Sequence, residues 1–459
     1  MDDLGKCILN LGIGNFEYGF TWGLEVERHR MSANGYLSTE PYPELLGQQN
    51  ANPYIKNDYF NTQSEVITPV ANSIGNAMNY LAALDHTLRA GLATNEYLWP
   101  FSLPPKLTVA RSELAYADVD PQKLAYYQEL ARRYGLTEGL PAGIHVNLAP
   151  KRIWTQMIAQ KLRQDPQKAR DELLLKQAIG FMHYRWLFTY LNGASPIAEA
   201  NYLADLPPQP VRSLRNSRQF GYGFASHFKG DYTSVTAYSE QMRAAIAADD
   251  LIAETAFHEA VRLRHPAGLM AMQQHGVSHI ELRMLDLDPT TAIGIRGSTL
   301  LLVQLLALHF MLMPKLDATV LVTASAINDQ VALEQPQQLT SQQQVGLKLF
   351  EQLQKLVVVA DLPPIYAAVV TQAAEKMVHP QLTAAGQLLP RIHCQSLARY
   401  GLQQARNFQL QSHLNPSPIY HGFQSNPHPS RAVLQRDLFD RFRHLPRLKR
   451  SETEASSYF

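Results

Sequence analysis

The sequence contains very little cysteine: among its 459 residues only Cys7 and Cys394 carry a thiol. Two thiols exclude a disulfide framework and a cysteine-rich zinc ribbon, and they fit a reducing compartment. A charge excess of either sign is also missing, because 41 Lys and Arg residues face 40 Asp and Glu residues. The overall charge therefore gives no reason to expect nucleic acid or an acidic membrane surface as a partner, and any ligand has to be recognised locally.

Long hydrophobic runs are absent as well. The longest apolar stretch, Thr299 to Met313, is too short to span a bilayer comfortably, contains Gln304 and His309, and stops at Pro314. A buried helix explains it better. The N-terminus begins with an acidic tip and lacks the charged-then-apolar pattern of a secretory signal. We therefore expect a cytoplasmic protein that acts on small molecules, with no membrane and no nucleic-acid partner.

The periodicity of apolar residues predicts an α+β fold. Residues 18–70 have the alternation and turn signals of strands, including the hairpin dipeptide Asn34-Gly35. Strand alternation returns at 142–150 and 279–289. Helical spacing covers 71–93, 121–135, 154–191 and 236–265, and residues 298–414 are almost entirely helical. We expect one large domain over 1–414, followed by a loose, proline-rich and locally basic tail at 415–459, which is more typical of a solvated end than of a nucleic-acid contact.

Several predicted strands carry polar groups on the face opposite their apolar one. In the strand that begins at Phe20, residues Phe20, Trp22, Leu24 and Val26 share one face. The opposite faces of this strand and of three others, together with an irregular segment before one of them, hold Glu25, Glu27, Asp58, Glu65, His145, Asn147, Glu281 and Arg283. If these strands share one sheet, four glutamates, one aspartate and one histidine converge on one surface.

Such a convergence needs a counter-charge. Two carboxylates about 4 Å apart repel by about 4 kcal/mol at an effective dielectric constant near 20. A divalent cation removes this repulsion, and oxygen-rich ligands favour magnesium or manganese over zinc. Arginines such as Arg283 and Arg215 beside such cations suit phosphoryl transfer. Each pair of polar residues taken alone is more typical of the solvated face of an antiparallel strand than of a metal site, so the hypothesis depends on the coincidence of several strands.

Seven short blocks in a fixed order resemble the bacterial glutamate–cysteine ligases, also called γ-glutamylcysteine synthetases. The blocks are GLEVER, NDYFNTQSEVITPV, LWPFSLPP, GIHVNL, YLNGASP, SLRNSRQFGY and IELRMLDLDP, and the similarity runs in register from about residue 20 to 300. The resemblance implies a curved, mainly antiparallel, glutamine-synthetase-like sheet whose concave face holds magnesium ions and ATP. It also implies that L-glutamate is activated as γ-glutamyl phosphate and then joined to the amino group of L-cysteine, the first step of glutathione biosynthesis.

The resemblance assigns roles to individual residues. The metal-binding positions of the family match Glu25, Glu27, Asp58, Glu65, His145 and Glu281. An ATP-site position matches Asn147, and an arginine that contacts phosphate and assists the transfer matches Arg283. Substrate-binding positions match Arg215, which would hold a carboxylate, and Tyr126 and Tyr222, which would line the acceptor pocket.

The sequence departs from the family pattern on the acceptor side. The arginine that usually follows the helix tyrosine is replaced by Tyr127, and Arg132 or Arg133 could compensate from later in the same helix. Two alternatives therefore stay open: a related ligase that joins glutamate or a similar acid to a different amine, and a non-catalytic relative that binds nucleotide. The oligomeric state and the number of bound metals are left open by the sequence.

Overall fold

The computed structural model describes residues 1–12, 19–47, 49, 52–110, 113–203, 205–222 and 228–414. Its centre is a seven-stranded sheet with the order β2-β3-β1-β5-β7-β6, and β4 pairs with β1 beside this path. The strands are β1 Phe20–Ser32, β2 Ile55–Asn57, β3 Gln63–Ile67, β4 Glu96–Leu98, β5 Ile144–Pro150, β6 Val261–Arg264 and β7 His279–Leu285. All pairings are antiparallel, which confirms the predicted α+β class with a mainly antiparallel sheet.

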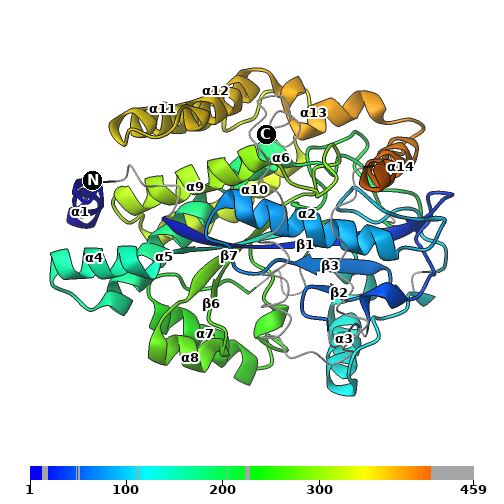
Figure 1. The fold of residues 1–459 in the computed structure, drawn as a ribbon, viewed down its shortest axis with the longest axis horizontal. Coiled ribbons are helices and arrows are strands. Elements are labelled where there is room, and N and C mark those ends of the chain that lie inside the picture. Colours follow the sequence, from blue (N-terminus) through cyan, green and yellow to red (C-terminus); the bar gives the residue numbers. More distant parts are fainter. Residues whose placement is uncertain are drawn as a thin grey trace.

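Helices cover the sheet unequally on its two sides (Figure 1). Helices α2, α5 and α9 lie along one face with α11 and α12 as an outer layer, whereas α3 and the α7–α8 pair stand at opposite ends of the other face. The helices are α1 Asp3–Asn10, α2 Ile74–Gly91, α3 Pro121–Tyr134, α4 Arg152–Leu162, α5 Pro166–His183, α6 Arg185–Asn192, α7 Val235–Ala247, α8 Gly268–His275, α9 Gly297–Leu312, α10 Leu321–Leu333, α11 Gln343–Val359, α12 Pro364–Val378, α13 Ala384–Leu388 and α14 Ala398–Leu414. No helix among the described residues is both long and apolar enough to cross a membrane.

The main core lies on the helix-covered face of the sheet. Trp22, Leu24 and Val26 of β1 are at most 1% exposed and pack with apolar residues of β5, β7, α2, α5 and α9 in one cluster. The apolar stretch predicted to be a buried helix is α9, and all but one of its residues are buried. Successive side chains of β1 point to opposite faces of the sheet, so burial of the apolar face leaves Glu25 and Glu27 on the other face. The apolar pattern thus fixes which surface carries the carboxylates.

Two predicted helical stretches divide differently in the structure. The stretch 154–191 forms α4, α5 and α6, because Arg163 adopts a left-handed backbone conformation with φ of 53° that ends α4, and Pro166 opens α5. The predicted helix 236–265 is wrong beyond Ala247, where residues Val261–Arg264 form the edge strand β6 by pairing with β7. Pairing with a distant strand outweighs local spacing here. The predicted tail at 415–459 lies outside the described residues.

A buried ion network joins the sheet to helix α2. The Asp85 carboxylate accepts hydrogen bonds from Arg28 of β1 and, at 2.8 Å, from Arg89 one turn further along α2. Both guanidinium groups also donate to the carbonyl of Ala292, at 2.6 and 2.8 Å. All three charged side chains are at most 4% exposed. The network fixes the back of β1, whose other face carries the glutamates.

We predict that Asp85→Asn destabilises the fold strongly, because it leaves two buried guanidinium groups without their counter-charge. The expected loss is about 3–5 kcal/mol in the free energy of unfolding, measured by urea titration followed by circular dichroism. The matched control is Asp3→Asn, which breaks the exposed pair with Lys6 and should cost less than about 1 kcal/mol. Equal losses in the two variants would contradict a structural role for the network.

Candidate active site

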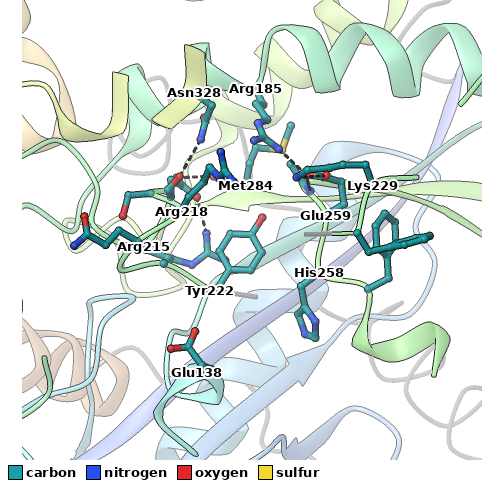
Figure 2. Close-up of a pocket in the computed structure, with 17 residues that line it drawn as sticks. Glu138, Arg185, Arg215, Arg218, Tyr222, Lys229, His258, Glu259, Met284 and Asn328 are labelled. Atoms are coloured by element: carbon teal, nitrogen blue, oxygen red, sulfur yellow. Dashed lines mark hydrogen bonds and ion pairs between the residues drawn. The ribbon is translucent and has the colours of Figure 1, made fainter. Parts of the chain in front are cut away.

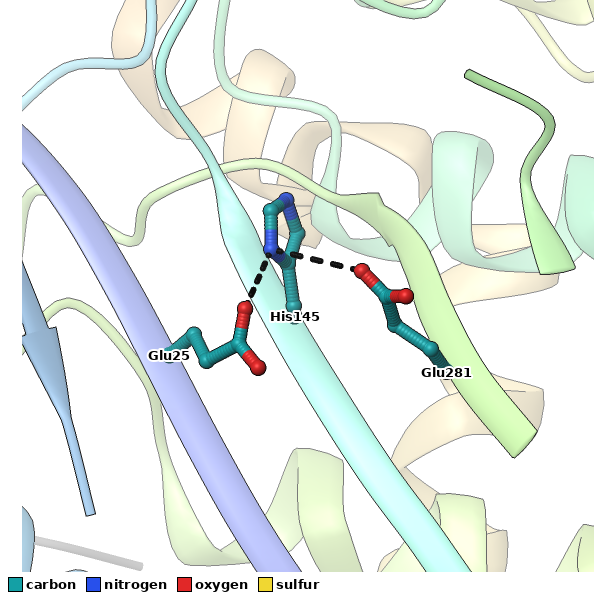
Figure 3. A group of neighbouring side chains, drawn as sticks. All are labelled: Glu25, His145 and Glu281. Carbon is teal, nitrogen blue, oxygen red and sulfur yellow. Dashed lines mark hydrogen bonds and ion pairs between the residues drawn. The ribbon is translucent and has the colours of Figure 1, made fainter. Parts of the chain in front are cut away.

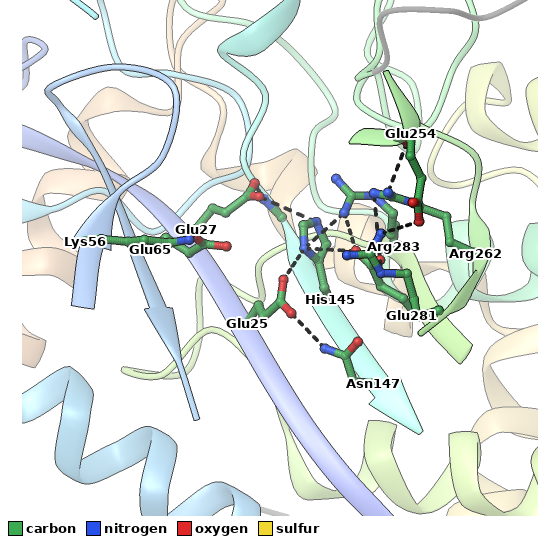
Figure 4. Close-up of polar contacts among 12 residues, drawn as sticks. Glu25, Glu27, Lys56, Glu65, His145, Asn147, Glu254, Arg262, Glu281 and Arg283 are labelled. Carbon is green, nitrogen blue, oxygen red and sulfur yellow. Dashed lines mark hydrogen bonds and ion pairs between the residues drawn. The ribbon is translucent and has the colours of Figure 1, made fainter. Parts of the chain in front are cut away.

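The polar face of the sheet forms one wall of a cavity of about 290 Å³. Strands β1, β2, β3, β5, β6 and β7 contribute side chains to this wall, and helix α3 closes the opposite side. Figure 4 shows that side chains from these separate strands meet around His145. Of the predicted site residues, nearly all line this cavity: Glu25, Glu27, Asp58, Glu65, Tyr126, His145, Arg215, Tyr222, Glu281 and Arg283.

The first cluster joins three strands (Figure 3). Glu25 of β1, His145 of β5 and Glu281 of β7 each offer a ligand atom, and these atoms lie within 4.8 Å of one another. The Nδ1 atom of His145 is 3.0 Å from Glu25 Oε2 and 3.8 Å from Glu281 Oε1. Pairing register brings them together, because Glu25 lies directly opposite His145 and the β5–β7 register shifts between Ile144 and Val146, where His145 sits.

The second cluster uses the other side of the same imidazole. Glu27, Glu65 and His145 also offer ligand atoms within 4.8 Å of one another, and all three residues are buried. Glu27 Oε1 lies 3.5 Å from His145 Nε2, while Glu27 Oε2 accepts a hydrogen bond from the amide of Gly143. Glu65 lies opposite Glu27 in the β1–β3 pairing and forms an ion pair at 3.0 Å with Lys56 of β2. Five of the six predicted metal ligands therefore fall into two clusters that share His145.

The electrostatics of the clusters are those of crowded, buried carboxylates. Burial raises the pKa of Glu27 to about 7, and the neighbouring Asp58 and Glu65 carboxylates add to the rise. Although burial and Arg283 disfavour a charged imidazole, Glu27 and Glu25 raise the pKa of His145. Burial also opposes ionisation of Glu281, but Arg262 and Arg283 hold its pKa well below the usual range. Protons and arginines thus supply the counter-charge around these carboxylates.

The donor set fits divalent cations. Each cluster offers two carboxylates and one imidazole nitrogen, and the carboxylate majority suits a hard cation such as Mg²⁺ or Mn²⁺. Within the described part of the chain, Glu281 Oε2 is buried and accepts no hydrogen bond, and its ion pairs with Arg264 and Arg262 are 3.3 and 3.8 Å long. Asp58 lines the same cavity from the segment before β3, but it belongs to neither cluster.

Two further predicted residues lie against the first cluster. Asn147 of β5 donates a hydrogen bond of 2.9 Å to Glu25 Oε1 and so orients that carboxylate. Arg283 of β7 donates to Glu281 Oε1 and lies 3.4 Å from His145 Nδ1. The Arg283 guanidinium lines the cavity, where a planar fork can contact phosphate oxygens. Asn147 itself is not among the lining residues, so its described contact is with Glu25.

A second cavity of about 190 Å³ adjoins the first (Figure 2). The two share Arg215, Tyr222, Glu138 and His258 as lining residues. Arg215 stacks on Tyr222, with its guanidinium carbon 4.3 Å from the ring centre, and lies 3.5 Å from Asp286. Arg215 also donates to the carbonyl of Arg283 at 3.1 Å, and its guanidinium packs so close to Gly143 that a Cβ atom there would force it to move. Arg215 is therefore fixed between the two cavities.

The structure does not place Arg132 or Arg133 at the cavity. Arg132 pairs with Glu129 on the surface of α3, and Arg133 donates to Asp249. Tyr127 itself is buried and donates its hydroxyl proton to the carbonyl of Asp58, so it supports the wall. Tyr126 accepts a hydrogen bond from Thr255 at the cavity rim. The compensation expected from the two arginines is thus wrong, because both point to solvent-exposed partners.

Several cavity residues were not predicted from the sequence. Arg262 and Arg264 lie on β6, which falls within the predicted helix 236–265. The alternation of apolar and charged residues in VRLR is the signal that could have identified this strand. Lys56, Lys123 and His258 also line the cavity, and they stand outside any strong periodic pattern. Burial lowers the pKa of His258 to about 3, so its imidazole is neutral. The positions of these five polar groups at the cavity therefore depend on how distant segments of the chain pack together.

Comparison with known proteins places the chain in a family. The family model described as glutamate-cysteine ligase matches residues 15–252 and 229–330. The chain belongs to the glutamate–cysteine ligase family. The glutathione biosynthesis bifunctional protein GshAB of Streptococcus thermophilus is 33% identical over 387 residues, which cover 84% of this chain and 51% of the relative. The chain thus spans about half the length of the curated relatives it matches first.

Solved structures of the family have the same fold. The bifunctional glutathione synthetase of Pasteurella multocida superposes with a TM-score of 0.83 at 26% identity, over 89% of this chain and 55% of that one. The glutamate–cysteine ligase of Francisella tularensis, solved in complex with AMP, superposes with a TM-score of 0.78 at 21% identity, over 96% and 95% of the two chains. The second likeness concerns the fold alone. Together they support the predicted α+β fold with a mainly antiparallel sheet.

The raised pKa of Glu27 predicts a pH-dependent stability in the absence of metal. Between about pH 4.5 and 7, the Glu27 carboxyl group keeps its proton in the folded chain but has released it in the unfolded chain. This group therefore lowers the free energy of unfolding as the pH rises. The glutamine side chain in Glu27→Gln does not titrate. Between pH 4.5 and 7.5, the free energy of unfolding of this variant should therefore rise by on the order of 1–3 kcal/mol relative to that of the unmodified protein. The measurement is urea unfolding in EDTA at several pH values.

The control for this experiment is Glu351→Gln, which changes an exposed carboxylate of α11 and should show no pH-dependent difference. A difference between Glu27→Gln and the unmodified protein that stays constant from pH 4.5 to 7.5 would show that the Glu27 carboxyl ionises normally.

Proposed function

We propose that this chain is an ATP-dependent ligase that joins the γ-carboxyl group of L-glutamate to the amino group of L-cysteine. The observation that carries the proposal is the pair of carboxylate clusters that share His145 beside Arg283. Membership of the glutamate–cysteine ligase family supports the same activity. We infer that residues 1–414 act as one catalytic unit, because six of the seven strands between Phe20 and Leu285 contribute to the site.

We infer that Glu25, His145 and Glu281 hold one divalent cation and that Glu27, Glu65 and His145 surround a second position, with Asp58 within reach of either from the cavity wall. Magnesium, with manganese as a substitute, suits these ligands. When bound, such cations neutralise charge on the phosphates of ATP and polarise the bond to be broken. The protein's own contribution is to hold the carboxylates correctly spaced, which Asn147 assists by orienting Glu25.

The first chemical step transfers a phosphoryl group to glutamate. A γ-carboxylate oxygen of glutamate forms a bond to the γ-phosphorus of ATP while the bond to the bridging oxygen breaks, and ADP leaves with the electron pair. Negative charge spreads over the transferred oxygens, where the Arg283 guanidinium can stabilise it. Arg215, fixed between the two cavities, is the group we assign to a substrate carboxylate.

The second step forms the amide. The nitrogen of the acceptor attacks the γ-carbonyl carbon of γ-glutamyl phosphate, the carbon–oxygen bond to phosphate breaks, and the amine gives up a proton. Inorganic phosphate leaves with the electron pair. Tyr126 and Tyr222 are positioned at the cavity to exclude water from the acyl phosphate and to contact the acceptor side chain. Water exclusion matters because hydrolysis of the acyl phosphate would waste ATP.

A direct test measures ADP release from the purified chain with ATP, Mg²⁺ and glutamate, with cysteine or with a panel of other amines. Transfer of ¹⁸O from the γ-carboxylate of glutamate to inorganic phosphate identifies the acyl phosphate route. We expect isotope transfer and the highest kcat/KM with cysteine. Isotope transfer with another amine but not with cysteine would replace cysteine as the acceptor. ATP binding without turnover for any amine would indicate a non-catalytic relative.

We predict that Glu25→Gln lowers kcat by at least about 100-fold, because it removes a charged ligand and weakens metal binding. Circular dichroism and the melting temperature should stay close to those of the unmodified protein, and the concentration of Mg²⁺ needed for half-maximal rate should rise. The control is Glu351→Gln, far from the cavity on α11. Unchanged kcat and metal dependence in Glu25→Gln would remove this residue from the site.

We predict that Arg283→Lys slows the phosphoryl transfer step by about 10- to 1,000-fold, because an ammonium group cannot reproduce the planar fork. Single-turnover measurement of ADP formation separates this step from product release. A normal single-turnover rate in the variant would contradict a role for Arg283 in the transfer.

A further inference from the structure

The cavity beside the metal clusters is lined by several cations, and they differ in their partners. These cations are Lys56, Lys123, Arg215, Arg262, Arg264 and Arg283. All but one form an ion pair with a carboxylate of the same structure: Lys56 with Glu65, Arg215 with Asp286, Arg262 and Arg264 with Glu281, and Arg283 with Glu281. Lys123 makes no ion pair with any carboxylate among the described residues.

Lys123 is held in place by an aromatic wall. It lies in the first turn of α3, and its ammonium stands 5.4 Å from the centre of the Tyr127 ring. That ring cannot swing away easily, since Tyr127 is buried and donates to the Asp58 carbonyl, while Tyr59 donates at 2.9 Å to the Tyr127 carbonyl. The charge of Lys123 is therefore presented to the cavity from a rigid surface.

Lys123 reaches the cavity from the wall opposite the sheet. Arg283 and the two carboxylate clusters lie on the sheet, whereas Lys123 comes from α3, three residues before Tyr126 on the opposite wall. A helix turn places residues three and four apart on one face, so Lys123, Tyr126 and Tyr127 form one side of the cavity. An amino acid with its amine near the activated γ-carboxyl group would direct its carboxylate toward this wall.

We propose that the Lys123 ammonium binds the carboxylate of the acceptor amino acid, so that the site selects α-amino acids over simple amines. This assignment rests on the proposed ligase function. An unpaired cation in a half-buried cavity is costly unless a ligand supplies the counter-charge, and a carboxylate does so with a charge-assisted hydrogen bond. Glu65 and Glu281 already form ion pairs with other cations of the cavity, whereas Lys123 forms none among the described residues, so the carboxylate of a substrate would supply its partner.

Two simpler roles of Lys123 would leave the selection between acceptors with and without a carboxylate unaffected. In the first role, Lys123 only covers the Tyr127 ring. In the second, it only offsets the charge of Asp58 and Glu65. Burial lowers the pKa of Lys123, and these two carboxylates oppose that effect. In both of these roles, removal of the charge would weaken the use of all acceptors equally. A carboxylate-binding role predicts a loss confined to acceptors that carry the carboxylate.

The experiment compares cysteine with cysteamine, which is cysteine without its carboxylate, and with hydroxylamine, which traps the acyl phosphate and needs no acceptor site. In Lys123→Met we expect KM for cysteine to rise about 10- to 100-fold with kcat within about threefold. The kcat/KM for cysteamine and the rate of hydroxamate formation should change less than about threefold.

Two further variants serve as controls. Lys123→Arg, which keeps the charge, should restore most of the preference for cysteine. The matched control is Arg132→Met, which removes a cation from the surface of the same helix and should leave all three acceptors unchanged.

The outcomes separate this proposal from the function on which it rests. No hydroxamate from the unmodified protein overturns the ligase function itself. Hydroxamate formation together with an unchanged cysteine-to-cysteamine preference in Lys123→Met overturns the role of Lys123 alone. Equal losses for cysteine and cysteamine assign Lys123 to packing or to general charge balance and also overturn the proposal.

Discussion

The repulsion between carboxylates that face each other across paired strands is the constraint on which this structure depends. Glu27 and Glu65 occupy directly opposed positions in the β1–β3 pairing, an arrangement that weakens an ordinary sheet. Burial is the main cause of the raised pKa of Glu27, and repulsion by the Asp58 and Glu65 carboxylates adds to it. A fold keeps such an arrangement only if the rest of the protein is stable enough to hold it, and the extensive core behind the sheet provides that stability.

His145 resolves part of this conflict by serving both clusters. Its two ring nitrogens face different glutamates, Glu25 on one side and Glu27 on the other. The irregular β5–β7 register at this position directs the ring between β1 and β7 rather than into the core. One imidazole therefore couples the two candidate metal positions, and a change in ligation at one position alters the charge felt at the other. On the opposite wall, α3 carries Lys123, which forms no ion pair with a carboxylate among the described residues.

Sequence patterns predicted the sheet face of the site well and the rest poorly. Alternation in β1, β5 and β7 is strict, so the directions of Glu25, His145 and Glu281 followed from it. The same alternation placed His29 beside the glutamates, yet His29 lies in the interior and its ring contacts the Leu140 carbonyl. The segment around Leu140, just before β5, covers that end of the strand. Lys123 and Arg262 could not be foreseen, because their positions depend on where α3 and β6 dock. The resemblance to a known family supplied the roles, and the pairing register supplied the geometry.

The order of the strands along the chain has a consequence for biosynthesis on the ribosome. The β5 strand pairs both with β1, far toward the N-terminus, and with β7, which follows more than a hundred residues later. A nascent chain that has emerged only through β5 can bring Glu25 and His145 together but lacks Glu281 and Arg283. It would also leave one edge of β5 unpaired, a surface prone to association until the late strand arrives. The chemistry of the cavity is therefore incomplete until β7 has been synthesised, so that chains that stop before this strand carry no working site.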